Sequence, residues 1–499
     1  MKKIALIAIV LLTLFINSCS KDSNDPQPNP TPSVTLDNEV NNFVWKGLNS
    51  WYNWQSNVPN LSDTKDDNSD DYYTYLNGFS NPEDLFTSLL YQYVGTVGEA
   101  NAVDRFSWFI DDYDVQNQQF QGISKSFGFR LQAVQINDTD IIFYVRYVAP
   151  NSPASDAGIK RGDIINALDD IVLTVDNYSS TVDKLSNETV KLSFVENDGS
   201  THKDDKTITA IVLSVNPVHF YKVFDDIGGR KVGYLVYNAF QSSYNDELNA
   251  VFADFKSQGV NELVLDLRLN GGGSVLTSAY LASMIDANAG TDIFANLKFN
   301  AKHSDSNGAY TFENTMNIYD TDGFKTGEES INRLPDITRL YVLTSGSTAS
   351  ASEMIINGLK AFMPVKVIGT TTYGKNVGSI TLYDSPSSDY TSEASANSSH
   401  KNAMQPIVFQ IYNKNNQSDY IQGFTPDIEV KEWNYWDNIL PFGDENEVVL
   451  KAALDDIRGV VTRTSIEAKS NSIDLPEIKQ LQNRFDKEMY IDNDFFKNQ

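Results

Sequence analysis

Cysteine is almost absent from this sequence of 499 residues, which contains one, Cys19. A single cysteine excludes an intrachain disulfide and a cysteine-rich metal site. Histidine is scarce as well, and none of the four histidines forms an H-x-x-x-H pair (His202, His219, His303 and His400). The sequence therefore predicts no metal centre and no cofactor.

Basic residues are also few, with 39 Lys and Arg against 66 Asp and Glu and a formal net charge of −27. Nucleic acids and anionic membrane surfaces attract cationic proteins, so this charge makes both poor partners. Hydrophobic residues make up 41% of the chain and aromatic residues 12%, which is enough for packed cores and excludes wholesale disorder. The length predicts about three domains.

A long apolar run occurs at the start of the chain. Residues 1–18 contain two lysines, then an apolar stretch, then small residues, which predicts an export signal too short for a convincing membrane span. Ile16-Asn17-Ser18-Cys19 resembles a loose bacterial lipobox, in which the cysteine becomes the lipidated first residue of the mature protein. An ordinary signal peptide followed by an incidental cysteine is the alternative.

Residues 19–35 are polar and rich in proline, which predicts a tether without a reason to fold. Asp22 and Asp25 resemble the surface-export signals of Bacteroidetes lipoproteins. We therefore expect a protein of the cell envelope that is anchored to the outer membrane by a lipid on Cys19. The periplasmic face and the surface face both stay open.

The most informative stretch runs from Arg339 to Lys375. It predicts an apolar strand over 340–343, small residues ending at Ser350, a helix over about 352–362, and a strand over 365–369. A hydroxyl at a strand-to-helix turn lies beside free backbone N–H groups and the positive end of the helix dipole, which suits an attacking oxygen and its oxyanion. Lys375 is the nearby candidate base, and the two groups can meet if their strands are neighbours.

Ser350-Ala351-Ser352-Glu353 also reads S-x-x-E, the sequence of a helix capping box. Ser350 would then only cap the helix, and Lys375 would be a solvated lysine in a surface loop. The whole stretch, S-T-A-S-A-S-E followed by a helix, a strand and Y-G-K, resembles the active-site segment of the carboxyl-terminal processing proteases. These are serine peptidases with a Ser–Lys dyad and, usually, a PDZ domain. The resemblance implies that Ser350 is the nucleophile and Lys375 its general base.

A second motif, D-L-R-L-N-G-G-G over residues 266–273, lies between an apolar strand and a helix. It resembles D-L-R-x-N-P-G-G of the same family, with Gly271 where proline is common. The resemblance implies an oxyanion hole formed by the N–H of Gly272 or Gly273 together with that of Ala351. Glycine-rich turns also bind phosphate, but neither G-x-G-x-x-G nor G-K-[ST] occurs here.

General-base chemistry requires a neutral lysine. The reference pKa of about 10.4 must fall to roughly 7–8, a shift worth about 4 kcal/mol, and burial between strands is the physical means. We therefore expect no Asp or Glu to form a salt bridge with Lys375 in the active state. Many family members have a Gln four residues after the lysine that orients the amine, and Ser379 stands there as a candidate third member of the site.

Short strands and turns follow one another from residue 126 to 215. Phe127-Gly128-Phe129 precedes a strand, and such a loop offers successive backbone N–H groups to the terminal carboxylate of a peptide that adds as an extra strand. Residues 152–165 read S-P-A-x-x-A-G-I-x-x-G-D-x-I, which resembles PDZ domains. The two motifs together predict a PDZ-like domain, with Phe127, Gly128 and Phe129 as peptide-binding residues.

The predicted fold is a multidomain α/β protein. A helical N-terminal domain (36–125) precedes the PDZ-like β domain (126–215), a serine protease core (216–435) and a C-terminal helical segment (436–499), of which 458–499 is expected to be a charged peripheral tail. The resemblance implies a core like that of ClpP and crotonase. Asp104-Arg105-Phe106-Ser107 resembles a short element of the family, and we assign no chemistry to it.

Two classes of function stay open. The first is an exported serine endopeptidase that cleaves unfolded or C-terminal polypeptide segments presented by the PDZ-like domain. The second is a catalytically inactive lipoprotein scaffold that captures peptide ends. Retention of Ser350, Lys375 and the three glycines together favours the enzyme. A Ser-His-Asp triad assembled from distant residues is a further alternative, and the oligomeric state is left open.

Overall fold

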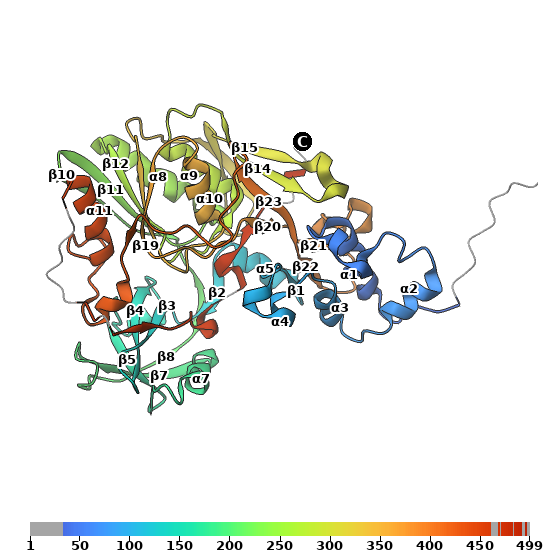
Figure 1. Ribbon diagram of the computed structural model, residues 1–499, viewed down its shortest axis with the longest axis horizontal. Coiled ribbons are helices and arrows are strands. Elements are labelled where there is room, and N and C mark those ends of the chain that lie inside the picture. The colour runs from blue at the N-terminus through green and yellow to red at the C-terminus, as the bar shows by residue number, and fades with distance from the viewer. Residues whose placement is uncertain (1–32, 461–467, 470, 483, 492–494, 497–499) are drawn as a thin grey trace, which may run out of the picture.

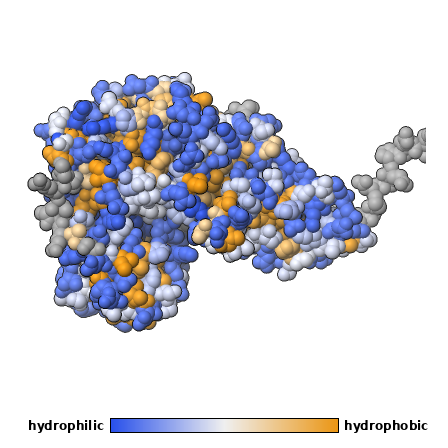
Figure 2. Space-filling view, viewed as in Figure 1, coloured by the Kyte–Doolittle hydropathy of each residue, from blue (hydrophilic) through white to orange (hydrophobic). Residues whose placement is uncertain are grey.

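The structure is a computed structural model that describes residues 33–460, 468–469, 471–482, 484–491 and 495–496. Figure 1 shows an α/β core, a small β unit below it, and the N-terminal helices to the right. Hydrophilic residues dominate the face seen in Figure 2, as the net charge of −27 leads one to expect. The predicted signal peptide and Cys19 lie outside the described residues. Among the described residues, no helix has both the length and the apolar character needed to cross a membrane.

The core is built on a six-stranded sheet in the order β10-β11-β12-β18-β19-β24. Its strands are Val218–Ile227 (β10), Arg230–Tyr237 (β11), Glu262–Asp266 (β12), Leu340–Thr344 (β18), Val365–Gly369 (β19) and Ile428–Glu429 (β24). β10 is antiparallel to β11, and the other neighbours are parallel. Every residue of β12 and β18 is buried, as expected where both faces of a parallel sheet are covered.

Helices cover both faces of this sheet. One face packs against α8 (Asn245–Gln258), α9 (Val275–Ile285) and α10 (Ala351–Leu359), and the other against α11 (Val448–Arg458). Successive side chains of a strand point to opposite faces, so Leu263 and Leu265 belong to the first core and Val264 to the second. This arrangement places the carboxyl ends of β12, β18 and β19 at one edge of the sheet.

A second six-stranded sheet has the order β13-β26-β20-β23-β14-β15. Its strands are Gly273–Ser274 (β13), Met489–Tyr490 (β26), Val377–Ser379 (β20), Ile407–Asn413 (β23), Ile293–Phe299 (β14) and Gly308–Thr311 (β15). β13 follows the glycine-rich loop after β12, and β20 follows the lysine loop after β19. β26 lies between them and is parallel to both, although it comes from the C-terminal end of the chain.

The small β unit is a twisted antiparallel sheet. It contains β3 (Phe129–Gln135), β4 (Ile141–Val148), β5 (Ile164–Leu168), β7 (Thr189–Val195) and β8 (Lys206–Thr209), with β6 (Ile171–Val172) beside β5. β2 (Ile123–Ser126) and β9 (Ile211–Ser214) pair with each other where the chain enters and leaves. A further strand, β25 (Ile473–Asp474), adds to the free edge of β3.

The N-terminal helices share their apolar interior with the α/β core, because Phe43 and Leu48 belong to the same cluster of buried side chains as Leu265. The helices are Glu39–Trp51 (α1), Ser69–Leu76 (α2), Pro82–Ser88 (α3), Val94–Val97 (α4) and Tyr113–Phe120 (α5). β1 (Trp108–Ile110) pairs with β22 (Ala403–Gln405) of the core. Helices in this region and an α/β core were both predicted, and the structure has both.

The end of the chain differs from the prediction of a C-terminal helical segment (436–499) with a peripheral tail. Its one α-helix among the described residues is α11. Residues 471–482 and 486–491, here named the C-terminal arm, run along β3 and then between β13 and β20 (Figure 1, red). Met489, Tyr490 and Ile491 are at most 6% exposed. The peripheral tail is therefore wrong for these residues, because strands that are distant in sequence bury them.

Candidate active site

Ser350 lies at the N-cap position of α10, directly after the loop that follows β18. Its backbone has φ 62° and ψ −118°, a conformation that costs about 1–3 kcal/mol for a residue with a side chain. The side chain is fully buried, and Oγ makes no hydrogen bond to a described residue. A capping serine accepts a hydrogen bond from the first turn of its helix. The capping-box arrangement of Ser350 and Glu353 is present, and the strained backbone and a hydroxyl without a hydrogen bond also fit a reactive group.

Glu353 connects the backbones of the two predicted catalytic residues. Its Oε2 accepts hydrogen bonds from the N–H groups of Ser350 (2.9 Å) and Lys375 (2.8 Å). Its Oε1 accepts from the N–H of Gly374 (2.7 Å) and the hydroxyl of Thr372 (2.5 Å). Burial raises the pKa of Glu353 to about 7, while these four donors favour its charged form. The S-x-x-E pattern pointed to Glu353 as part of a cap, and its link to the lysine loop was missed.

Lys375 is fully buried in the loop between β19 and β20. Its Nζ forms a salt bridge with Glu488 Oε2 at 2.9 Å and lies 4.5 Å from the centre of the Phe106 ring. Burial lowers the pKa of Lys375, and the negative charge of Glu488 opposes that shift. The sequence analysis expects no acid to pair with this lysine in the active state. The structure pairs it with Glu488, which contradicts that expectation for the arrangement described here.

Ser379 contacts the same glutamate. Its Oγ donates a hydrogen bond to Glu488 Oε1 at 2.5 Å and accepts one from Gln405 Nε2 at 2.8 Å. Gln405 is buried in β22 and comes from a different strand than the family's usual Gln. It was missed because its position, 26 residues from Ser379, carries no motif. The Gln405 amide is thus connected through the Ser379 hydroxyl to the Glu488 carboxylate that pairs with Lys375.

The glycine-rich loop lies against Ser350. A Cβ on Gly272 would be 2.3 Å from the Glu488 carbonyl oxygen, 2.7 Å from Ser350 Cβ and 3.1 Å from Ala351 N, so only glycine fits there. The N–H of Gly272 donates to Asn270 Oδ1 at 2.9 Å, whereas that of Gly273 donates to the Glu488 carbonyl at 2.6 Å. Ala351 is the first residue of α10, and its N–H has no partner within the helix. Of the two predicted glycines, Gly273 therefore has the N–H that faces the arm.

The 104–107 element packs on the lysine loop, although the sequence analysis assigned it no chemistry. Asp104 accepts hydrogen bonds from the Tyr52 hydroxyl (2.7 Å) and from the N–H of Phe106 (3.0 Å). Arg105 donates to the Gly374 carbonyl at 2.5 Å. The Phe106 ring shields the Lys375 amine from water. The 104–107 element, which follows the helices α1 to α4, therefore helps to keep water away from the lysine.

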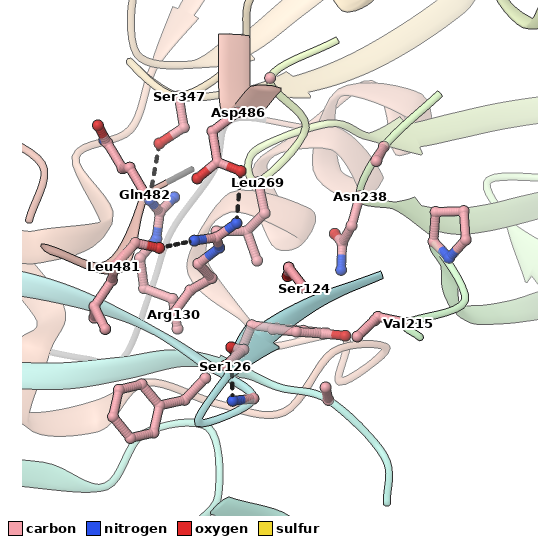
Figure 3. A pocket seen from close by; sticks show the side chains of 18 of the residues that line it. Ser124, Ser126, Arg130, Val215, Asn238, Leu269, Ser347, Leu481, Gln482 and Asp486 are labelled. Carbon is pink, nitrogen blue, oxygen red and sulfur yellow. Dashed lines mark hydrogen bonds and ion pairs between the residues drawn. The ribbon is translucent and has the colours of Figure 1, made fainter. Parts of the chain in front are cut away.

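A cavity of about 210 Å³ separates the small β unit from the core (Figure 3). Gly128 and Phe129 line it from one side and Gly271 and Gly272 from the other, with arm residues between them. Phe127 and Phe129 are buried and stack at 5.7 Å, and the Gly128 N–H donates to Ser126 Oγ. The predicted peptide-binding loop thus opens toward the same space as the glycine-rich loop.

Ser350 Oγ has no hydrogen-bond partner among the described residues, so neither a histidine nor the Lys375 amine is bonded to it in this structure. His219 instead packs edge-on to Tyr147, and burial lowers the pKa of His219 to about 4. No group of three or more His, Cys, Asp or Glu side chains capable of holding a metal ion occurs in the part of the chain that the structure describes.

Two family models match the chain. Peptidase family S41 matches residues 231–430, and the peptidase S41 N-terminal domain matches residues 39–108. The chain belongs to peptidase family S41. The S41 match contains Gly272, Gly273, Ser350 and Lys375, and the N-terminal match contains the 104–107 element. The recognised family and the α/β fold with N-terminal helices are thus confirmed.

One known protein similar to this S41 member is the chloroplastic C-terminal processing peptidase of Tetradesmus obliquus. The two are 26% identical over 240 residues, which cover 46% of this chain and 47% of the relative. The chloroplastic carboxyl-terminal-processing peptidase 2 of Arabidopsis thaliana is 29% identical over 233 residues (46% of this chain, 40% of the relative). The chain thus spans less than half the length of these two relatives. A crystal structure assigned to the S41 proteases, from Bacteroides fragilis, has a TM-score of 0.62 and 27% identity, covering 87% of this chain and 100% of that one.

Proposed function

We propose that this S41 member is a serine endopeptidase that acts through Ser350 and Lys375. The observation that carries the proposal is that Ser350, which has a buried hydroxyl, and Lys375, which has a buried amine, both donate their backbone N–H groups to one carboxylate, that of Glu353. The glycine-rich loop and the first residue of α10 lie against Ser350. These are the parts that acyl transfer needs: nucleophile, base and oxyanion donors.

In the proposed reaction, Ser350 Oγ attacks a peptide carbonyl carbon while the neutral Lys375 amine takes the hydroxyl proton. The carbonyl oxygen gains negative charge and accepts hydrogen bonds from the N–H groups of Gly273 and Ala351. The C–N bond then breaks, and the leaving amine takes the proton from Lys375. Water attacks the acyl-enzyme with the lysine again as base, which releases the new carboxylate and restores Ser350.

We further infer that the small β unit acts as a PDZ-like module. It would capture unfolded or C-terminal segments along β3, next to the Phe127–Phe129 loop. Strand addition to this edge is supported by β25, which already pairs with β3. The export signal and a lipid on Cys19 would hold the enzyme at the outer membrane, and this stays a prediction from the sequence.

The proposal is tested by cleavage of a reduced and alkylated protein and by labelling with a fluorophosphonate probe. Ser350→Ala removes the nucleophile and should abolish both signals, and Lys375→Ala should lower the rate of cleavage at least about 10³-fold. Lys325→Ala, in the exposed β17 strand (Lys325–Ser330), is the matched control and should behave like wild type. Wild-type cleavage by both site variants would show that the dyad is misassigned. Binding of peptides without labelling would favour the inactive scaffold.

A further inference from the structure

The C-terminal arm contacts the proposed catalytic groups through Glu488. The carboxylate of Glu488 bonds to Lys375 Nζ (2.9 Å) and to Ser379 Oγ (2.5 Å), and its carbonyl accepts from the Gly273 N–H (2.6 Å). One arm residue therefore contacts the proposed base Lys375, the hydroxyl of Ser379 and the proposed oxyanion donor Gly273. Glu488 is itself 1% exposed, so water does not screen the charge pair.

The backbone of the arm fills a strand position in the site. β26 is parallel to β13 on one side and to β20 on the other, with Tyr490 opposite Ser274 and opposite Ser379. These are the strands that begin at the glycine-rich loop and the lysine loop. An extended substrate that presents a carbonyl to Gly273 would need the space that the arm fills.

The arm also covers the free edge of the small β unit. β25 is antiparallel to β3, and the Leu475 N–H donates to the Ala133 carbonyl at 3.2 Å. Ile478 is 4% exposed and packs into the apolar core of that unit. Arg130 on β3 donates to Asp486 Oδ1 at 2.8 Å, just before the arm reaches Glu488 (Figure 3). The arm thus pairs with the edge of β3 and with the strands β13 and β20, as an extended peptide would.

The charge of Glu488 affects the protonation of Lys375. The groups that face the Lys375 side chain or influence its charge are Glu488, the Phe106 ring, Asp104 and Arg105, while Glu353 binds its backbone N–H. Glu488 is the one that bonds to Nζ directly, and it favours the ammonium form. An ammonium cannot accept the proton of Ser350, so the arm fills the site and also opposes the loss of the Lys375 proton that burial favours.

We propose that the C-terminal arm is an internal peptide ligand that holds the Ser350–Lys375 site inactive, and that substrates compete with it for one track from β3 to β20. The inference rests on the proposed peptidase function. The strand contacts of the arm, β25 and β26, are two residues each, and buried side chains such as Met489 add to them. A polypeptide that adds to β3 would compete with β25 for the same edge, and the arm's own sequence should inhibit when supplied as a free peptide.

Two full-length variants release the arm in different ways. Glu488→Gln removes the charge that pairs with Lys375. Gly271→Ala adds a Cβ that would lie 1.2 Å from the Asp486 carbonyl oxygen, and Gly271 has no positive φ that would forbid a side chain. Glu445→Gln removes an exposed acid paired with Arg458 and is the matched control. Glu488→Gln alone carries the test if Gly271→Ala fails to fold.

Cleavage of a reduced and alkylated protein and fluorophosphonate labelling of Ser350 are measured in all four proteins. We expect both rates to rise at least about tenfold in Glu488→Gln and Gly271→Ala, because the competent population increases, and to stay unchanged in Glu445→Gln. A synthetic peptide of residues 473–491 should inhibit Glu488→Gln competitively, and the same peptide with Gln for Glu488 should inhibit less.

Equal cleavage and labelling rates in wild type, Glu488→Gln and Gly271→Ala would overturn the inference and leave the peptidase assignment intact. A complete lack of cleavage and labelling in all four proteins would instead count against the proposed function, and the inference would fall with it. If cleavage stays faster than in wild type when Ser350→Ala is added to Glu488→Gln, the activity does not come from Ser350. That result would reject the proposed active site as well as the inhibitory role of the arm.

Discussion

At the scale of single residues, the site is decided by which charges are buried together. Lys375 and Glu488 are both buried, and each stabilises the charged form of the other. Burial alone would lower the pKa of the lysine and raise that of the glutamate. The same dry surroundings that make Lys375 a usable base therefore also make a single carboxylate an effective inhibitor of it.

The first prediction concerns the pH dependence of peptidase activity. The base must be neutral, so activity should rise with pH as Lys375 loses its proton. Burial already lowers the pKa of Lys375, and Glu488 raises it again. In Glu488→Gln the pKa should fall further, so the rising limb of kcat/KM should move to lower pH. Profiles measured for wild type, Glu488→Gln and Glu445→Gln check this, and a limb that stays in place would contradict it.

The second prediction concerns Gly272. Its φ of +121° and the distance of 2.7 Å from a built Cβ to Ser350 Cβ leave no room for a side chain. The built Cβ would also lie 2.3 Å from the Glu488 carbonyl oxygen, so the effect is measured in the Glu488→Gln background. There Gly272→Ala should push the glycine-rich loop away from Ser350 and lower kcat about 10²-fold or more relative to Glu488→Gln, since a displaced oxyanion donor costs that much. Gly290→Ala, also at positive φ but with open space around it, is the control for backbone strain alone. Comparable losses in both variants would point to strain and not to the site.

At the scale of elements, the site depends on two loops that Glu353 fastens together. The first loop leads from β18 to α10 and contains Ser350. The second leads from β19 to β20 and contains Lys375. β18 and β19 are neighbours in the sheet, so both loops leave the same edge. The carboxylate of Glu353 then accepts N–H groups from both.

The third prediction is that Glu353→Gln lowers kcat at least about tenfold with little change in KM, because it disturbs the dyad and not the peptide track. A glutamine amide would direct two N–H donors toward the backbone N–H groups of Ser350 or Lys375. Loss of the buried acceptor should also cost about 1–3 kcal/mol of stability. Steady-state kinetics and urea unfolding measure the two effects. An increase in KM alone would contradict the positioning role.

At the scale of the whole molecule, a buried ionic network joins the small β unit to the core. Arg268, in the loop after β12, pairs with Asp266 (2.7 Å), Glu432 (2.8 Å) and Glu447 (2.9 Å). Arg161 of the small β unit pairs with Glu432 as well, at 2.5 Å. The orientation of the small unit, and with it the track from β3 to the site, therefore depends on these charges.

The fourth prediction concerns acid sensitivity. Burial alone would raise the pKa of Glu432, but Arg161 and Arg268 hold it below its usual value. This stabilisation is complete above the unfolded pKa of about 4.3 and is lost as the pH falls toward the folded value. Glu432→Gln should lower the free energy of unfolding by roughly 3–5 kcal/mol at neutral pH. It should also reduce the loss of stability as the pH falls. Thermal unfolding between pH 3 and 8 measures this, with Glu429→Gln, an exposed acid near Lys431, as control.

Local pattern was sufficient for most of the elements around the site. β18, α10 and β19 lie where apolar runs and small residues predicted them, within two or three residues. Their side chains face neighbours that are near in sequence or in the same sheet, so the period of the pattern carries the information.

The sequence by itself determined the chemistry available to this protein: one hydroxyl at a helix start, one lysine after the next strand, and a run of glycines between strand and helix. Short-range patterns hold that information, because each motif is contiguous. The tertiary structure alone decided which state the site is in. Glu488 is 113 residues from Lys375 and Gln405 is 26 from Ser379, and only chain folding brings such residues into contact. Buried charges act over a few ångströms of space, whatever their separation along the chain.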